Sequence, residues 1–292
     1  MRRGPTMTLS FPPFTAAVKQ LLIANGAVFL LVALLGAAFS AADISGWVNF
    51  HLGLVPALAV LHGWVWQFIT YSFVHAGLFH ILFNLLALWM FGAQLEMDWG
   101  YSLFMQFYFF CVIGAAICTT IVSFTGLLGA SPLVPTVGAS GGIYGILVAF
   151  GILHGDSEIM LFPIPFLIKA RYFVIGLILL ALYGALSSSH NLGQSTAYMA
   201  HLGGGLFGYL FLKFVPRRGF GFVSSEWLYG VRNSYYRRKR RRAAKKFEVY
   251  MRKHDRADYR HEDYFDEDGK LRDPEARDRP KKNGDAQPPW VN

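Results

Sequence analysis

Residues 101–124 read YSLFMQFYFFCVIGAAICTTIVSF, an apolar run without a single charged side chain. A helix needs about 20 mostly apolar residues to cross a bilayer, so this run predicts a membrane span. Stretches of the same character, with soft boundaries, lie at 16–39, 76–95, 139–155, 170–187 and 197–215. We therefore predict an all-α, polytopic membrane protein, a bundle of six transmembrane helices.

The first connection, 40–75, has a different composition from the spans. It mixes apolar and polar residues and is rich in aromatic side chains, among them Trp47, Phe50, Trp64 and Trp66. Because tryptophan is favoured where membrane meets water, we expect this loop to lie in the membrane interface.

Lysine and arginine are distributed unevenly along the chain. None occurs between Lys19 and Lys169, whereas 21 of the 27 follow Pro216. With six spans, every cation that flanks a span falls on one side: Arg2, Arg3, Lys19, Lys169, Arg171, Lys213, Arg217 and Arg218. The positive-inside rule then predicts a multi-pass protein of the cell (inner) membrane with both termini cytoplasmic.

These patterns divide the chain into a cytoplasmic segment, 1–15, a membrane domain, 16–215, and a basic tail, 216–292, that we expect to be largely disordered. The net charge of +9 resides mainly in the tail, so it does not indicate nucleic acid as a partner. The basic block 237–246 could attract anionic lipid, at about 1 kcal/mol per cation. A solvated tail that only fixes topology explains this block equally well.

A short motif, Gly138-Ala139-Ser140-Gly141-Gly142, opens the fourth predicted span. A serine beside glycine in a membrane is usually a packing or capping residue. Here a loop becomes a helix, so backbone N–H groups without helical partners surround Ser140. The glycines would let a substrate backbone approach closely. Ser140 is therefore a candidate nucleophile.

A histidine, His201, lies near the start of the sixth predicted span, followed by Gly203 and Gly204. A lone histidine on a helix is commonly structural, but a neutral imidazole can accept a proton. Gly204 and Gly208 are four residues apart, as are Gly141 and Gly145, and small residues at this spacing let helices approach closely. We infer that the fourth and sixth helices pack together and bring His201 beside Ser140, as an activated serine requires.

A third polar set lies around the second span, where His80 and Asn84 share one helical face and His75 precedes them. Histidine pairs can bind metal, but no H-E-x-x-H motif, nearby carboxylate or suitably spaced cysteine accompanies this one. We predict neither a metal nor another cofactor. Side chains of this kind can instead donate hydrogen bonds to a developing oxyanion.

Taken together and in order, these residues resemble the rhomboid intramembrane proteases in their six-helix bacterial form, over about residues 45–215. The matching pieces are His75, the His80–Asn84 run, Gly92-x-x-Leu95-Glu96-x-x-x-Gly100, the G-x-S-G at Gly138–Gly141, Tyr144, and Ala200-His201 with Gly204-x-x-x-Gly208. The fold implied is a six-transmembrane-helix rhomboid-like bundle with an interfacial first loop.

The resemblance implies an intramembrane serine endopeptidase with a Ser140–His201 dyad and no acidic third member. Ser140 would attack the scissile carbonyl and His201 would take its proton, while the Ser140 N–H, His80 and Asn84 line the oxyanion hole. Tyr144 would stack on the base. The supporting residues are His75, Gly138, Gly141, Gly204 and Gly208. Substrates would be transmembrane segments, and the site would open to the extracytoplasmic side beneath the connection 188–196.

One residue departs from the resemblance, because many family members carry Trp-Arg where this chain has Trp66-Gln67. That change puts the stability of the first connection, or substrate gating, in doubt. The nearest alternative function is that of an inactive rhomboid-like protein that binds client helices; such proteins usually lack the nucleophile or the base. A transporter or channel would be expected to have internal repeats and charged or broken segments at mid-membrane, and neither is found.

Overall fold

A computed structural model describes residues 12–160, 167–187 and 192–215, together with Arg237, Lys239, Arg240, Gly269 and Lys270. The chain divides into two compact units, Met1–Ser224 and Ser225–Asn292. The helices described below belong to the first unit. Predictions on residues 1–11 and on most of the tail lie outside the described residues. Of the predicted connection 188–196, residues 188–191 lie outside them too, whereas 192–196 already belong to the last helix.

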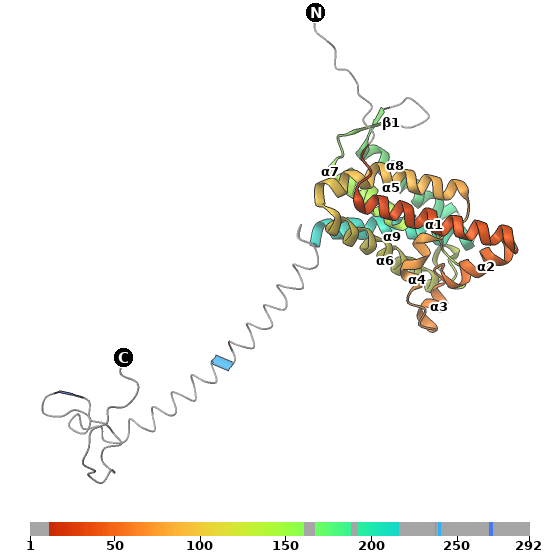
Figure 1. Cartoon of the computed structure of the whole chain (residues 1–292), viewed down its shortest axis with the longest axis horizontal. Helices are drawn as coiled ribbons and strands as arrows, with labels where there is room; N and C mark the ends of the chain where they lie inside the picture. Colours follow the sequence, from red (N-terminus) through yellow and green to blue (C-terminus); the bar gives the residue numbers. More distant parts are fainter. Residues whose placement is uncertain are drawn as a thin grey trace, which may run out of the picture. The chain divides into compact units, whose positions relative to one another are not determined.

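A helix lies at each of the six predicted spans (Figure 1): α1 (Ala16–Ala38), α5 (Leu78–Trp99), α6 (Tyr101–Thr125), α7 (Ser140–Leu153), α8 (Ala170–Ser187) and α9 (Leu192–Phe214). Within the described chain, α1, α5, α6 and α8 are long and apolar enough to cross a membrane. Helix α9 has 23 residues but is more polar. Helix α7 has 14 residues and is therefore about 21 Å long, shorter than a hydrocarbon core of about 30 Å.

The first connection folds into α2 (Ala41–His51), α3 (Pro56–Leu61), α4 (Gln67–Thr70) and the 3-10 turn η1 (Tyr71–Phe73). The hydroxyl of Ser40 caps α2 by accepting a hydrogen bond from the Asp43 N–H at 3.4 Å. A stack of four rings runs across this connection: Trp47, His51, Trp64 and Trp66. Trp47 and Trp66 are about half exposed, as expected of aromatic residues in a membrane interface.

Gln67 ties this connection together. Its side chain is fully buried; Oε1 accepts a hydrogen bond from the Val55 N–H at 3.0 Å, and Nε2 donates to the Phe50 carbonyl at 2.8 Å. The side-chain amide of Gln67 thus binds two parts of the loop, one through its oxygen and the other through its nitrogen. At the position where the sequence departs from the family pattern, Gln67 itself therefore joins the segments.

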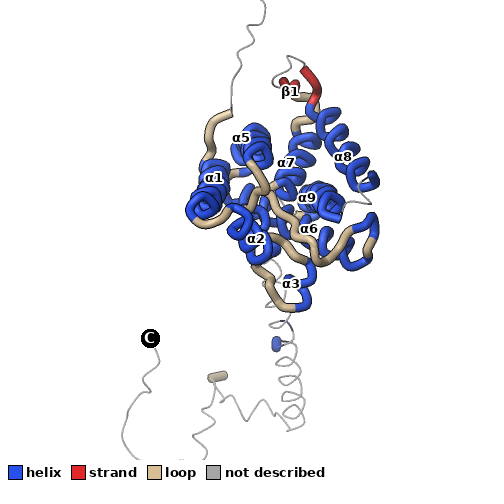
Figure 2. Tube along the Cα trace, turned by 90° about the vertical axis from the view of Figure 1, so that its right-hand side faces the viewer, coloured by secondary structure: helices blue, strands red, loops and turns tan. Residues whose placement is uncertain are grey.

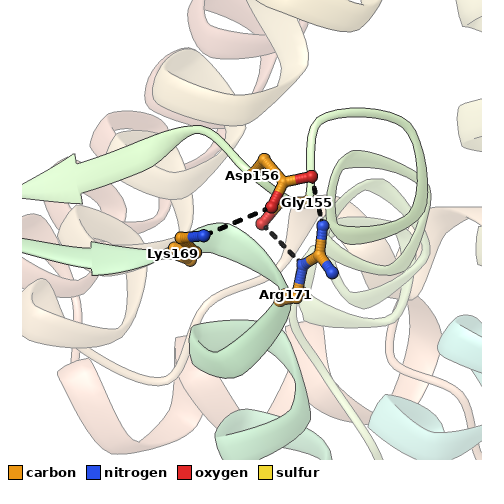
Figure 3. Close-up of polar contacts among 4 residues, drawn as sticks. All are labelled: Gly155, Asp156, Lys169 and Arg171. Carbon is orange, nitrogen blue, oxygen red and sulfur yellow. Dashed lines mark hydrogen bonds and ion pairs between the residues drawn. The ribbon is translucent and has the colours of Figure 1, made fainter.

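A two-stranded hairpin joins α7 to α8, which the sequence analysis did not predict. Strands β1 (Glu158–Met160) and β2 (Leu167–Lys169) pair antiparallel. Beside them, the Asp156 carboxylate forms ion pairs with Arg171 and, at 3.5 Å, with Lys169 (Figure 3). Arg171 also donates from Nε to the Gly155 carbonyl at 3.2 Å. These contacts fasten the start of α8 to the end of α7.

The helices pack around α9, which lies against α6, α7 and α8, while α1 and α8 lie at opposite edges of the bundle (Figure 2). The core centres on α6, where Phe104, Phe107 and Tyr108 are fully buried. By contrast, the outward faces of α1 and α8 expose many large apolar side chains. Such faces are suited to contact with lipid. The chain is a multi-pass membrane protein.

Glu96 connects the N-terminus of α1 to α5. Its buried carboxylate accepts hydrogen bonds from the Ala17 N–H at 2.8 Å, from the Val18 N–H at 2.9 Å, and from the Thr15 hydroxyl. The first N–H groups of a helix have no partner within it, so a carboxylate there acts as a cap and also meets the positive end of the helix dipole. Helix α1 is therefore capped by a residue from another helix.

Candidate active site

Ser140 is the first residue of α7 and follows a loop that the first connection holds in place. Leu54 and Thr136 exchange two backbone hydrogen bonds of 2.9 Å, and the Gly138 N–H donates to the Tyr71 carbonyl, also at 2.9 Å. Gly138 has φ of +124°, a backbone conformation that side chains disfavour. The N–H groups of the first turn of α7, that of Ser140 included, lack helical acceptors.

The structure brings the predicted nucleophile and base into contact. Nε2 of His201, on α9, lies 2.8 Å from Oγ of Ser140. Nδ1 of His201 is buried and has no hydrogen-bond partner among the described residues. The arrangement pairs a serine hydroxyl with a potential base, and no described carboxylate contacts Nδ1 of that base.

The glycines of α7 and α9 account for that contact. A Cβ placed on Gly204 would overlap the Gly141 carbonyl, and one on Gly208 would lie 2.8 Å from Cα of Gly145. The two backbones therefore touch along this seam, as their spacing predicted. Any larger residue at these positions would push His201 away from Ser140.

Two tyrosine rings surround His201. Tyr144, one turn after Ser140 on α7, stacks on the imidazole at 4.3 Å between centroids and 7° between planes. Tyr198, three residues before His201 on α9, meets the same imidazole nearly at right angles, at 6.0 Å and 88°. Sequence reasoning singled out Tyr144 and missed Tyr198, whose only signal was its position one turn from His201.

His80, on α5, directs its Nε2 toward the loop before Ser140. A Cβ on Gly138 would lie 2.7 Å from this nitrogen, so the missing side chain makes room for the ring. The other nitrogen, Nδ1, faces the Ala76 N–H at 3.4 Å and accepts from it. Nδ1 is then unprotonated, which leaves the hydrogen on Nε2, where it can be donated.

His75 supports the loop from the other side. Its Nε2 accepts a hydrogen bond from the Ala139 N–H at 3.5 Å, and its ring meets that of His80 at 5.1 Å. Burial and the neighbouring His80, opposed by the Phe73 backbone carbonyl, lower the pKa of His75 to about 4. A neutral His75 is what the acceptor role at Nε2 requires.

Asn84 lies one turn beyond His80 on α5 and is buried. Its Nδ2 has no hydrogen-bond partner among the described residues, and the structure records no hydrogen bond between Asn84 and Ser140. A buried amide group without an acceptor is costly, so this one is available to a ligand. The described residues contain no cluster of three or more histidine, cysteine, aspartate or glutamate side chains that could hold a metal ion.

Comparison with known proteins identifies relatives of this chain. A family model described as the Rhomboid domain matches residues 62–218, more than half of the chain. Rhomboid protein 1, mitochondrial, of Saccharomyces cerevisiae is 31% identical over 148 residues, 50% of this chain and 40% of that protein. Rhomboid-like protein 19 of Arabidopsis thaliana is 27% identical over 219 residues, 72% of this chain and 64% of that protein.

A bacterial relative is also found. Rhomboid protease GluP of Bacillus subtilis is 37% identical over 90 residues, which is 31% of this chain and 16% of that protein. The chain thus spans less than two thirds of the length of each of these relatives.

Proposed function

Since this chain belongs to the rhomboid family, we propose that it is an intramembrane serine endopeptidase that cleaves transmembrane segments of other membrane proteins. The observation that carries the proposal is the 2.8 Å contact between Ser140 Oγ and His201 Nε2, formed between α7 and α9. An unactivated serine is a weak nucleophile, and an adjacent base is what makes it reactive.

In this mechanism the Ser140 hydroxyl attacks the scissile carbonyl while His201 Nε2 takes its proton. His201 then returns that proton to the leaving amine, and a water molecule hydrolyses the acyl-enzyme by the same route. Tyr144, stacked on the imidazole, holds the ring in the orientation that a carboxylate maintains in soluble triads. No cofactor takes part in these steps.

The negative charge that develops on the carbonyl oxygen needs donors. The candidates are the Ser140 N–H, the Nε2–H of His80 and the Asn84 amide, and the last two come from the same face of α5. The unpaired amide of Asn84 supports this role, because the transition state would supply its missing acceptor. One such donor contributes roughly 3 kcal/mol to catalysis.

Membrane topology bears on access to the site. We propose that both termini are cytoplasmic and that the site opens to the extracytoplasmic side of the cell membrane. Lys19, Lys169 and Lys213 support this orientation, since each lies at the end of a span that the positive-inside rule assigns to the cytoplasm. Because α7 is shorter than the bilayer, Ser140 at its start would lie below the outer surface, where a transmembrane segment could reach it.

We further propose that residues 16–215 form the membrane domain, with 1–15 and 216–292 as cytoplasmic extensions. In the basic block 237–246, the described residues Arg237, Lys239 and Arg240 are exposed, which suits attraction to anionic lipid. Vesicle flotation at rising phosphatidylserine content, with the tail present or removed, tests that attraction.

The experiment for the main proposal uses full-length protein in proteoliposomes with a labelled single-span substrate library. The wild type should cleave members of the library, and Ser140→Ala and His201→Ala should lower the rate by at least about a thousandfold. A fluorophosphonate probe should label Ser140 in the wild type alone.

Two results would contradict the protease assignment. Cleavage that persists in Ser140→Ala would exclude Ser140 as the nucleophile. A wild type that captures single-span proteins, is not labelled by the probe and cleaves nothing would match the alternative, an inactive client-binding protein.

A further inference from the structure

Tyr198 connects His201 to a helix that carries none of the proposed catalytic groups. Its ring lies over Gly184 of α8: a Cβ on that glycine would come within 2.7 Å of three ring atoms, Cζ, Cε1 and Cε2. The same ring meets the His201 imidazole edge-on at 6.0 Å. One side chain therefore touches both the proposed base and the backbone of α8.

Helix α8 is fastened unequally along its length. At its start, Arg171 pairs with Asp156, and Val174 packs on Gly151, where a Cβ would lie 3.1 Å away. Toward its end, the buried residues are the small Ala181, Gly184 and Ala185. The outward face, with Leu179, Leu180, Tyr183 and Leu186 among others, is exposed. In this half of α8, the large ring of Tyr198 lies directly against Gly184.

The two tyrosine rings that contact His201 come from different helices. Tyr144 belongs to α7, which the glycine seam fixes to α9, so that contact moves with the dyad. Tyr198 belongs to α9, but its ring also lies against Gly184 of α8. If α8 moved outward, the Tyr198 ring would gain room to move away from the imidazole.

We propose that Tyr198 is a positioning residue for His201 and that its seat on Gly184 makes alignment of the dyad depend on the position of α8. The packing of the Tyr198 ring against the backbone of Gly184 couples His201 to α8. A Cβ at position 184 would overlap the ring, so only glycine leaves space for it there. The expected size of the effect is that of one aromatic contact, about three- to tenfold in rate.

Because the inference rests on the proposed function, its test has a readout that needs no substrate. The rate of Ser140 labelling by a fluorophosphonate probe is measured in proteoliposomes beside kcat and KM for cleavage. Tyr198→Ala should lower kcat and the labelling rate by about three- to tenfold while KM stays unchanged. Tyr198→Phe keeps the ring and should restore both rates.

Gly184→Ala should have the same effect, because its methyl group displaces the ring. Gly176→Ala is the matched control on the same helix, since a Cβ there meets nothing within 4 Å, and it should leave both rates unchanged. In the double variant the losses should not add, because both substitutions act through one ring.

The inference is overturned if Tyr198→Ala labels as fast as the wild type, if the two losses add, or if Gly176→Ala slows labelling as much as Gly184→Ala. If the protein cleaves no substrate but its Ser140 is still labelled at a rate that depends on Tyr198, the positioning role of Tyr198 is supported. That result would contradict only the protease assignment.

Discussion

Two of the three histidines of the site have a partner on Nε2, and the third has its partner on Nδ1. His201 uses Nε2 toward Ser140, His75 uses Nε2 toward the Ala139 N–H, and His80 uses Nδ1 toward the Ala76 N–H. Backbone N–H groups thus decide where the proton lies on two of the three rings. The residue types alone do not give this assignment, because it follows from the path of the loop between η1 and α5 and the loop before α7.

Stability should depend on pH through His75. Its pKa is about 4 in the folded chain against 6.5 for the free side chain, so only the unfolded chain binds a proton between these values. This contribution to stability is fully present above pH 6.5 and is lost as pH falls toward 4. We expect the difference in unfolding free energy between the wild type and His75→Gln to narrow between pH 7 and pH 5.

Reversible unfolding in mixed detergent micelles measures this difference. The other histidines are the same in both proteins, so their contributions cancel when the two are compared. An equal loss of stability in the two proteins would mean that His75 titrates normally in the folded chain.

Individual residues were predictable where a spacing carried the information. Glycines four residues apart on two spans indicated that Ser140 and His201 would meet, and their side chains lie 2.8 Å apart. Tyr198 could not be found in this way, because its contact depends on Gly184 of a different helix. The linking role of Gln67 could not be predicted either, since its hydrogen-bond partners are backbone groups that only the folded connection brings together.

At the scale of elements, the seam between α7 and α9 is the feature on which the site depends. Gly141 and Gly145 on one helix face Gly204 and Gly208 on the other, with backbone atoms in contact. Their neighbour Gly205 faces Val148 instead, where a Cβ would lie 3.2 Å from a side-chain methyl group and not against the backbone. Adjacent glycines on one helix therefore have different tolerance for a side chain.

Gly204→Ala should separate α7 from α9 and lower kcat by at least about a hundredfold, because a shift of about 1 Å in a reacting group has that effect. Gly205→Ala should retain most of the activity. Cleavage rates and Ser140 labelling in proteoliposomes compare the two variants. Equal activity in both would show that the close contact at Gly204 is not needed for the dyad.

The ends of the helices were harder to predict than their existence. Hydropathy placed the end of the second span at residue 95, because Glu96 and Asp98 follow, yet α5 continues to Trp99. Both charges have partners: Glu96 caps α1, and Asp98 lies 2.7 Å from His154, the residue that follows α7. Gly100, with φ of +78°, is where the helix ends. The hairpin of β1 and β2 was missed because three-residue strands leave almost no periodic signal.

At the scale of the whole molecule, α1 buries side chains only in its first half. Its buried residues are Ala17, Val18, Leu21 and Asn25, all near its start, and its later half is exposed. The Glu96 cap lies at this same end. The packing of α1 on the bundle therefore depends on a few residues within 15–25.

Glu96→Ala should lower the free energy of unfolding by about 1–3 kcal/mol, because it leaves the Ala17 and Val18 N–H groups without an acceptor. Asp98→Ala is the matched control, because it removes a carboxylate two residues further along the same helix. The pair of Asp98 with His154 is partly exposed, so it contributes about 0–1 kcal/mol. Unfolding in mixed micelles compares them. Equal losses would mean that the cap contributes no more than a surface pair.

The cap on α1 also has a consequence for biosynthesis. Glu96 lies 79 residues after Ala17, so α1 leaves the ribosome well before its cap exists. At about 5–20 residues per second, that delay is roughly 4–16 seconds. During this interval the first turn of α1 must find acceptors elsewhere, in water, lipid headgroups or the insertion machinery. The arrival of α5 is thus the moment in synthesis at which α1 is fixed in place.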